Sequence, residues 1–274
     1  MTGSSLRPRV GTVWRHLHRV PVTVAYAVLL VAVTAVMAAL GPGVHDRVIE
    51  YASTNLHNLA HGRFGTLLSS AFIADDDLFY FWLPGLICLL AAVELRWRSR
   101  RLVVMFFVGH VVTTLVVAAG LVVAVELGWL PRSISRVADV GVSYGVLTVV
   151  GALTAVVPAR LKPVWLGWWL AGAVAVLVVS SDFTEAGHAI AFAVGLLMST
   201  RLEPPAHWTR GEAVVFGVGV CFGYAVLVHT PELALIGLPA SSLCATVTAV
   251  VSRRVQTKSS GRDTAQSARQ DSGG

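Results

Sequence analysis

Eight apolar stretches, each about as long as a helix that crosses a bilayer, constrain the fold of this chain more than any other feature. They occupy residues 22–40, 78–95, 102–125, 139–157, 163–181, 183–200, 212–229 and 233–251. A spanning helix needs about 17 to 25 apolar residues, because hydrocarbon offers no water to the backbone. The composition agrees, since 55% of the residues are hydrophobic and 13% are charged, about half the charged share of soluble domains. We therefore expect an all-α, polytopic transmembrane helix bundle.

Basic residues are distributed unevenly between the two sides that these spans define. If the N-terminus lies in the cytoplasm, the inside segments hold 17 of the 21 Lys and Arg residues. Cytoplasmic loops carry such an excess, so both termini are predicted to be cytoplasmic. The net charge of +6 then comes from anchors that face the lipid bilayer, and we expect no nucleic-acid partner. The excess of Arg over Lys, with abundant Ala, Val and Gly, is a compositional hint of a high-GC genome, and we expect the protein in a bacterial plasma membrane.

A serine and a histidine enter two of the apolar helices from the same predicted side. Ser143 lies four residues after Asp139, or about 6 Å along its helix. His188 lies three residues after Glu185 and six after Asp182, or about 5 to 9 Å along. Taken singly, the serine could bond to the preceding turn, and the histidine could be a buried imidazole or line an ion pathway. Together they form the minimum for nucleophilic catalysis, so we expect them within hydrogen-bond reach of each other.

Small residues accompany both polar side chains. Gly141 and Gly145 flank the serine, while Ala191 and Gly195 follow the histidine at positions i+3 and i+7. Small residues on one helix face let another helix approach closely. We therefore expect these two helices to pack together, with Glu185 at the interface as a solvated cap of its helix.

The longest predicted outside loop, residues 41–77, has the apolar periodicity of a half-submerged amphipathic helix. His57 and His61 stand four residues apart, as zinc-binding histidines do on one helix face, but position 58 holds Asn in place of that motif's glutamate. Asn55 and Asn58 are expected to cap the helix or bond locally. We expect neither a metal ion nor a cofactor.

These motifs resemble the rhomboid family of intramembrane serine proteases, and more closely its divergent rhomboid-like membrane proteins of actinobacteria. Residues 141–144, Gly-Val-Ser-Tyr, are similar to the family's Gly-x-Ser-Gly. The stretch 187–195 resembles its Ala/Gly-His-x-x-Gly-x-x-x-Gly. The resemblance covers about residues 22–200 and implies a six-helix core, with Ser143 as the nucleophile and His188 as the general base.

Two departures from the family concern the oxyanion. Rhomboids carry His-x-x-x-Asn in the second core helix, whereas residues 78–84 here contain neither His nor Asn, and Tyr144 replaces the glycine after the nucleophile. Loss of one oxyanion donor lowers a rate by about 10² to 10³. The candidate replacement donors are therefore the Ser143 backbone N–H and the side chains of Asn55, His57 and Asn58 in the outside loop. Tyr144 is a further candidate for contact with the oxyanion or the substrate.

Two functions follow from the resemblance. One is a serine protease that cleaves membrane-embedded polypeptides, and the other is a non-catalytic rhomboid-like protein that binds transmembrane clients. A transporter fits less well because charge in the middle of the spans is almost absent. The predicted organisation is a basic N-terminus (1–21), the six-helix core (22–200), a C-terminal transmembrane hairpin (201–252) and a disordered cytoplasmic tail (253–274).

Overall fold

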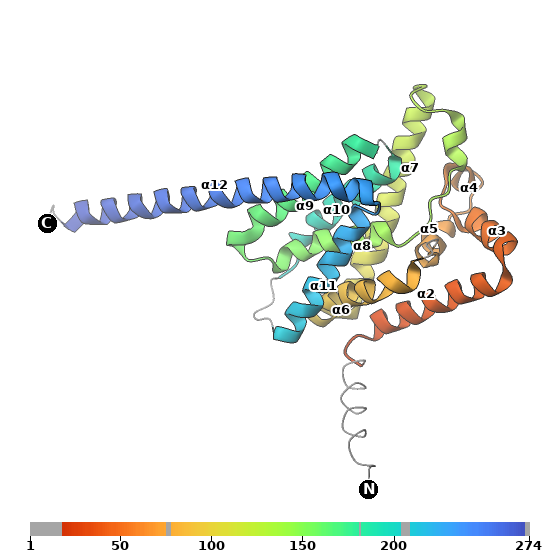
Figure 1. The fold of residues 1–274 in the computed structure, drawn as a ribbon, viewed down its shortest axis with the longest axis horizontal. Coiled ribbons are helices and arrows are strands. Elements are labelled where there is room, and N and C mark those ends of the chain that lie inside the picture. Colours follow the sequence, from red (N-terminus) through yellow and green to blue (C-terminus); the bar gives the residue numbers. More distant parts are fainter. Residues whose placement is uncertain (1–17, 75–77, 181, 204–208, 272–274) are drawn as a thin grey trace, which may run out of the picture.

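The computed structural model describes residues 18–74, 78–180, 182–203 and 209–271, with side chains up to residue 252. Every regular element in these ranges is a helix (Figure 1). The longer helices are α2 (Pro21–Leu40), α3 (Pro42–Ala52), α6 (Phe79–Val103), α7 (Gly109–Glu126), α8 (Ser143–Ala152), α9 (Lys162–Ser180), α10 (Phe183–Ser199), α11 (Arg210–Leu227) and α12 (Pro231–Asp271). The short ones are α4 (Leu56–Ala60), α5 (Thr66–Ser69), η1 (Ser70–Phe72), η2 (Val104–Val108), η3 (Arg132–Arg136), η4 (Leu153–Val156) and η5 (Ala159–Leu161).

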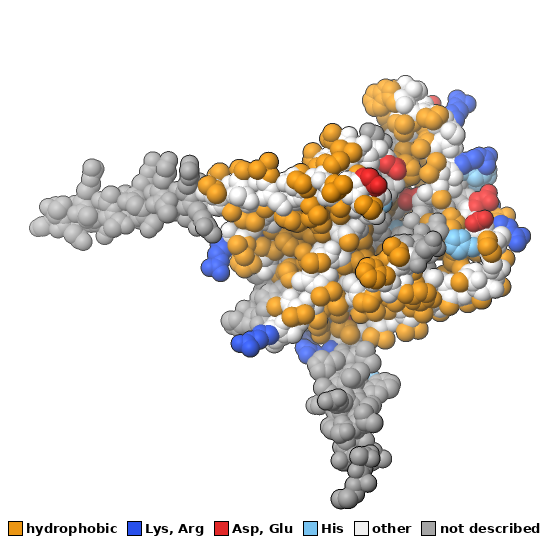
Figure 2. All heavy atoms as spheres, in the orientation of Figure 1, with side chains coloured by type: hydrophobic (Ala, Val, Ile, Leu, Met, Phe, Trp, Pro, Cys, Tyr) orange, Lys and Arg blue, Asp and Glu red, His pale blue; other side chains and the backbone are white. Residues whose placement is uncertain are grey.

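The eight apolar stretches all form helices, which confirms the predicted all-α fold. Five helical stretches are long and apolar enough to cross a membrane, and one of them, Phe79–Glu126, contains two successive spans. The backbone leaves the helical conformation between these two spans at Arg98, where φ is +68°. Ser143–Val156 and Phe183–Ser199 are shorter apolar helices. Hydrophobic side chains cover most of the visible surface (Figure 2), and the chain is a multi-pass membrane protein.

The core of the bundle is α8, in which every side chain from Tyr144 to Ala152 is buried. It packs closely against α10. A Cβ atom on Gly195 would overlap the carbonyl oxygen of Thr148, and one on Gly151 would overlap that of Phe192. The Tyr144 ring also lies against Gly187, near the starts of both helices, so α8 and α10 run parallel. Ser143 is the first residue of α8, and His188 lies in the second turn of α10. Gly145 instead faces Phe106, and Gly141 has open space around its Cα, so neither glycine brings α8 and α10 together.

Two further helix pairs surround this core. Gly219 of α11 lies against the backbone of Leu89 in α6, and Gly167 of α9 lies against Thr248 in α12. Instead of a disordered tail from residue 253, α12 continues as helix to Asp271 (Figure 1). The sequence contains no proline after Pro239 to interrupt it, and helix extension adds one hydrogen bond for each residue fixed.

Candidate functional site

Ser143 is the first residue of α8, and the outside loop holds the segment that precedes it. The backbone N–H of Gly141 donates to the carbonyl oxygen of Ser70 (3.0 Å), and that of Thr54 donates to the carbonyl oxygen of Asp139 (2.9 Å). Gly141 has φ +126°, a conformation that favours glycine. The chain thus turns sharply into α8, and the Ser143 side chain remains partly exposed.

The start of α8 lies deep in the bundle. The Tyr144 ring is 6.2 Å from the ring of His110, centroid to centroid. His110 is in the first turn of α7, about 24 Å along that helix from Glu126 at 1.5 Å per residue. α8 is short, and it starts beside the half of α7 that is farther from Glu126, because the loop before α8 runs into the protein. Ser143 therefore lies deeper in the bundle than the about 6 Å predicted by counting residues from Asp139 along one helix.

Tyr144, the residue after Ser143, packs against the helix that carries His188. Its ring contacts Gly187, where a Cβ atom would overlap it, and its centroid lies 6.0 Å from that of His188. The Tyr144 hydroxyl and the His188 Nε2 atom are both buried without a hydrogen-bond partner. The expected hydrogen bond between Ser143 and His188 is therefore not formed in this conformation, because Nε2 has no partner and Nδ1 faces Glu185.

Glu185 holds His188 from the opposite side of the imidazole. Its Oε2 atom lies 3.2 Å from His188 Nδ1, and its Oε1 atom lies 3.3 Å from Nδ1 of His229, just after α11. The prediction of a solvated Glu185 is wrong, because its side chain is 2% exposed, whereas that of His229 is 46% exposed. The i, i+3 spacing of Glu185 and His188 places them on one helix face, so their contact could be predicted from the sequence. The contact with His229 could not, because His229 is distant in sequence.

A second serine–histidine contact lies in the outside loop. Ser70 Oγ is 3.1 Å from Nε2 of His110, and the Thr54 hydroxyl donates to Ser70 Oγ at 2.9 Å. Ser70 is 1% exposed, whereas Ser143 is partly exposed, so a polypeptide cannot reach the Ser70 hydroxyl. We interpret this contact as a structural link between the loop and α7. Sequence reasoning missed it because 40 residues separate the two side chains.

The candidate oxyanion donors differ in how far their side chains are already engaged. Asn58 Nδ2 donates to the carbonyl oxygens of Glu50 and Ser53, both at 2.8 Å, and its Oδ1 accepts from Arg63. Asn55 Oδ1 accepts from the backbone of Asn58 and caps α4. His57 packs against the ring of His61. Among the described residues, nothing bonds to the Asn55 amide nitrogen or to the His57 ring nitrogens, so both side chains still have an unused donor or acceptor.

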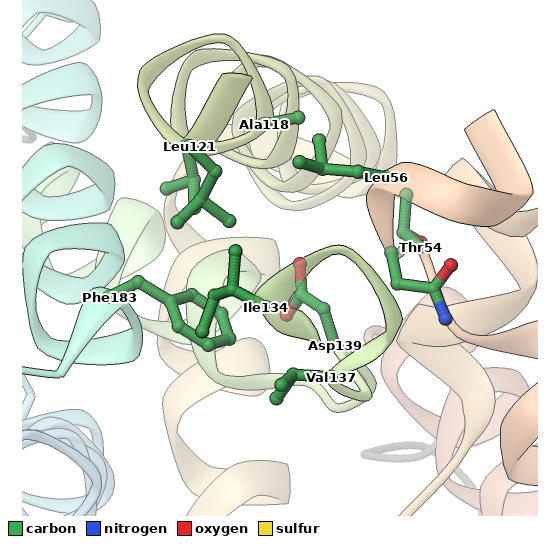
Figure 3. A pocket seen from close by; sticks show the side chains of 10 residues that line it. Thr54, Leu56, Ala118, Leu121, Ile134, Val137, Asp139 and Phe183 are labelled. Carbon is green, nitrogen blue, oxygen red and sulfur yellow. The ribbon is translucent and has the colours of Figure 1, made fainter. Parts of the chain in front are cut away.

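A small cavity lies beside Asn55, between the outside loop, α7 and the start of α10 (Figure 3). Its volume is ≈ 10 Å³, about the space that one water molecule requires. Asp139 and Phe183 also line it. Asp139 lies outside the spanning helices, and burial raises the pKa of its carboxyl to about 6. A titratable acid thus lies within the segment that leads into α8.

The fold and this buried cluster define a class: a multi-pass helical membrane protein whose polar site lies within the bundle, at the starts of two parallel core helices. The family model for rhomboid-like proteins matches residues 15–202, which include Ser143 and His188. The chain therefore belongs to the rhomboid-like protein family, as the sequence motifs predicted. No curated protein and no solved structure matches it.

Proposed function

We propose that this protein is an intramembrane serine protease that cleaves membrane-embedded polypeptides, with Ser143 as the nucleophile and His188 as the general base. The observation that carries the proposal is the state of His188. A buried carboxylate, Glu185, occupies its Nδ1 side, while Nε2 has no partner. A carboxylate that accepts Nδ1–H leaves a lone pair on Nε2, which is the tautomer that a general base requires.

The reaction then follows the usual course of acyl transfer. The Ser143 oxygen attacks the scissile carbonyl carbon while its proton moves to Nε2 of His188. The C–N bond breaks, and the leaving amine takes that proton. Water, deprotonated by the same nitrogen, hydrolyses the acyl-enzyme.

Two local features support an oxyanion site without the family's usual side chains. The backbone N–H of Ser143 begins α8 and therefore has no partner within the helix. Donors of this kind stabilise a developing oxyanion. The Asn55 amide nitrogen is the side-chain candidate, since the outside loop is hydrogen-bonded to the segment before α8.

Catalysis requires a rearrangement that brings Ser143 to His188, and the Tyr144 ring, which packs beside His188, is the group that we expect to move. Catalytic hydrogen bonds are often long in proteins without substrate and shorten when it binds. A substrate segment that enters beside α8 could displace the ring. We also infer a bacterial plasma membrane, cytoplasmic termini and a site reached from the outer side, because 17 of the 21 Lys and Arg residues fall in segments that this orientation places inside.

A second function, binding of transmembrane clients without cleavage, is favoured by one specific observation. The Tyr144 ring fills the space beside Gly187, and Ser143 has no hydrogen bond to His188 among the described residues. If the ring stays in place when a polypeptide binds, the serine remains inactive and the protein only holds its client.

The test is labelling of the purified full chain with a fluorescent fluorophosphonate, which reacts with activated serines. We expect labelling of the wild type, none of Ser143→Ala, and unchanged labelling of Ser70→Ala, the matched serine next to the other histidine. If the wild type is not labelled and does not cleave reconstituted single-span substrates, the protease proposal is wrong and client binding is the preferred function. Loss of labelling in Ser70→Ala alone would place the nucleophile elsewhere.

A further inference from the structure

The contacts of Glu185 extend beyond His188 to a second imidazole. Glu185, His188 and His229 each offer one ligand atom, and these atoms all lie within 4.8 Å of one another. The structure assigns these three residues as a binding site for a divalent transition-metal ion of the zinc type, and we infer that the ion switches off His188 as a base. The metal site stands by itself, whereas the switch rests on the proposed protease function.

The spacing of the ligand atoms fits a tetrahedral ion. With metal–ligand bonds of about 2.0 to 2.2 Å, neighbouring ligand atoms lie about 3.3 to 3.6 Å apart. Glu185 Oε2 is 3.2 Å from His188 Nδ1, and Glu185 Oε1 is 3.3 Å from His229 Nδ1. His229 is half-exposed and follows the end of α11, so a small rotation of its side chain closes the third edge.

The types of donor select the ion. Two imidazole nitrogens and one carboxylate oxygen suit zinc and similar first-row metals, whereas calcium and magnesium prefer oxygen alone. The cluster carries the negative charge of Glu185 among neutral imidazoles, and its buried position strengthens the attraction for a cation. His229 provides the route of entry from the surface, since its side chain is 46% exposed.

Metal binding and base catalysis exclude each other at His188. Without metal, Glu185 accepts the Nδ1 proton and Nε2 keeps its lone pair. A metal ion bonded to Nδ1 needs the lone pair of that nitrogen, so the single proton of the neutral ring must move to Nε2. Nε2 then donates a hydrogen bond and cannot accept the proton of Ser143.

The outside loop offers a matched control. His57 and His61 have ring centroids 4.3 Å apart, but His61 Nδ1 is already 2.7 Å from the carbonyl oxygen of His57. Among the described residues, no third ligand joins this pair. We therefore expect it to contribute little to tight metal binding.

The binding test uses the full chain, purified in detergent and stripped of metal. We titrate Co²⁺, whose visible absorption reports tetrahedral coordination, and then displace it with Zn²⁺. We expect one equivalent of tetrahedral Co²⁺ in the wild type and in the His57→Ala/His61→Ala double variant. In His229→Ala, which removes an exposed ligand and should fold normally, the affinity should fall by more than the roughly 10- to 100-fold that loss of an outer-shell partner causes. If the wild type shows no tetrahedral band, or if only the His57→Ala/His61→Ala variant loses it, the metal site is wrong. Glu185, His188 and His229 would then only be hydrogen-bonded to one another.

The switch is tested by fluorophosphonate labelling in EDTA and in Zn²⁺. We expect Zn²⁺ to suppress labelling of the wild type by about tenfold or more, whereas His229→Ala should be labelled in both conditions. Equal wild-type labelling in both conditions, with Co²⁺ bound, would overturn the switch. If metal binds but the protein is labelled in neither condition, the protease proposal is wrong and the metal site stands. If the protein is labelled but binds no metal, the metal site is wrong and the protease proposal stands.

Discussion

Two glutamates, Glu94 four residues before the break in α6 at Arg98 and Glu185 in the first turn of α10, are both buried, but their partners differ. Each side chain is 2% exposed within an apolar helix. A buried carboxylate is costly unless hydrogen bonds or opposite charges compensate it. The contrast between them shows that burial alone does not identify a functional acid, and that the chemistry of the partners does.

Glu94 is surrounded by donors that do not titrate. Its two oxygens accept from the backbone N–H groups of Val22 and Thr23, and from the hydroxyls of Thr23 and Ser99, over 2.6 to 2.9 Å. α2 has no side-chain cap of its own, so Glu94 supplies one from the neighbouring helix. This carboxylate is fully satisfied and has no proton to exchange with its partners.

Glu185 is shared between two imidazoles that can change tautomer, gain a proton or bind a metal ion. Beside it, the His188 Nε2 atom and the Tyr144 hydroxyl remain unpaired. Unpaired buried polar atoms cost about 1 to 3 kcal/mol each. Such atoms also occur elsewhere in the bundle, for example on Thr113 and Trp169, so what separates this end from the capped start of α2 is a carboxylate bonded to an imidazole whose other nitrogen is open.

The largest effect on folding is expected from Glu94→Ala. The substitution leaves buried backbone and hydroxyl donors unpaired, so it should lower the stability by about 3 to 5 kcal/mol. Thermal unfolding in detergent, followed by circular dichroism, measures this loss. Glu126→Ala is the control, because Glu126 is exposed at the end of α7. Equal melting temperatures for the two variants would remove the structural role of Glu94.

Glu185→Gln should produce the opposite pattern. Glutamine keeps the size of the side chain but no longer selects the tautomer of His188, so the rate of Ser143 labelling should fall by about 10² or more. Stability should change by less than about 1 kcal/mol. Glu94→Gln serves as the counterpart, because its folded fraction should label at the wild-type rate. If Glu185→Gln labels at full rate, Glu185 does not orient the base.

Local and long-range features of this site differ in how well the sequence predicts them. The helix that Asn55 caps is evident from the sequence, because the cap and its partner Asn58 lie three residues apart. The parallel packing of the Ser143 and His188 helices likewise follows from two segments that enter from one side. The partners of Glu185, the depth of α8 and the bulk of Tyr144 beside Gly187 depend on contacts between distant segments, which no local pattern encodes.

Two substitutions at Asn55 separate its structural role from a catalytic one. Aspartate keeps the oxygen that caps α4 but lacks the amide donor, whereas alanine lacks both. Cleavage by an active enzyme should fall by about 10² in both variants if the amide holds the oxyanion. Only Asn55→Ala should also lose about 1 kcal/mol of stability, measured by thermal unfolding. Undiminished turnover in Asn55→Asp would exclude the side chain from the mechanism.

Asp139 should make the stability depend on pH. Its folded pKa is about 6, raised by burial from 3.8, so the folded protein binds the proton more tightly than the unfolded chain does. The resulting stabilisation is fully present below pH 3.8 and is lost as the pH rises through about 6. The protein should therefore gain about 1 kcal/mol between pH 7 and pH 5 from this group. Melting curves of Asp139→Asn should lack that part of the gain, and an identical pH profile would contradict the assignment.

The smallest effect is expected from Tyr144→Phe. The Tyr144 hydroxyl is buried without a partner, so its removal takes away an unpaired polar atom while the ring continues to fill the space beside Gly187. We expect a change in stability between zero and about +1 kcal/mol, with unaltered labelling of Ser143. A loss of more than about 1 kcal/mol would mean that the hydroxyl is bonded through water, for which His188 Nε2 is the nearest unpaired candidate on the facing helix. All buried polar atoms beside Glu185 would then have hydrogen-bond partners, as those beside Glu94 do. An unpaired His188 Nε2 atom would no longer distinguish the surroundings of the two glutamates.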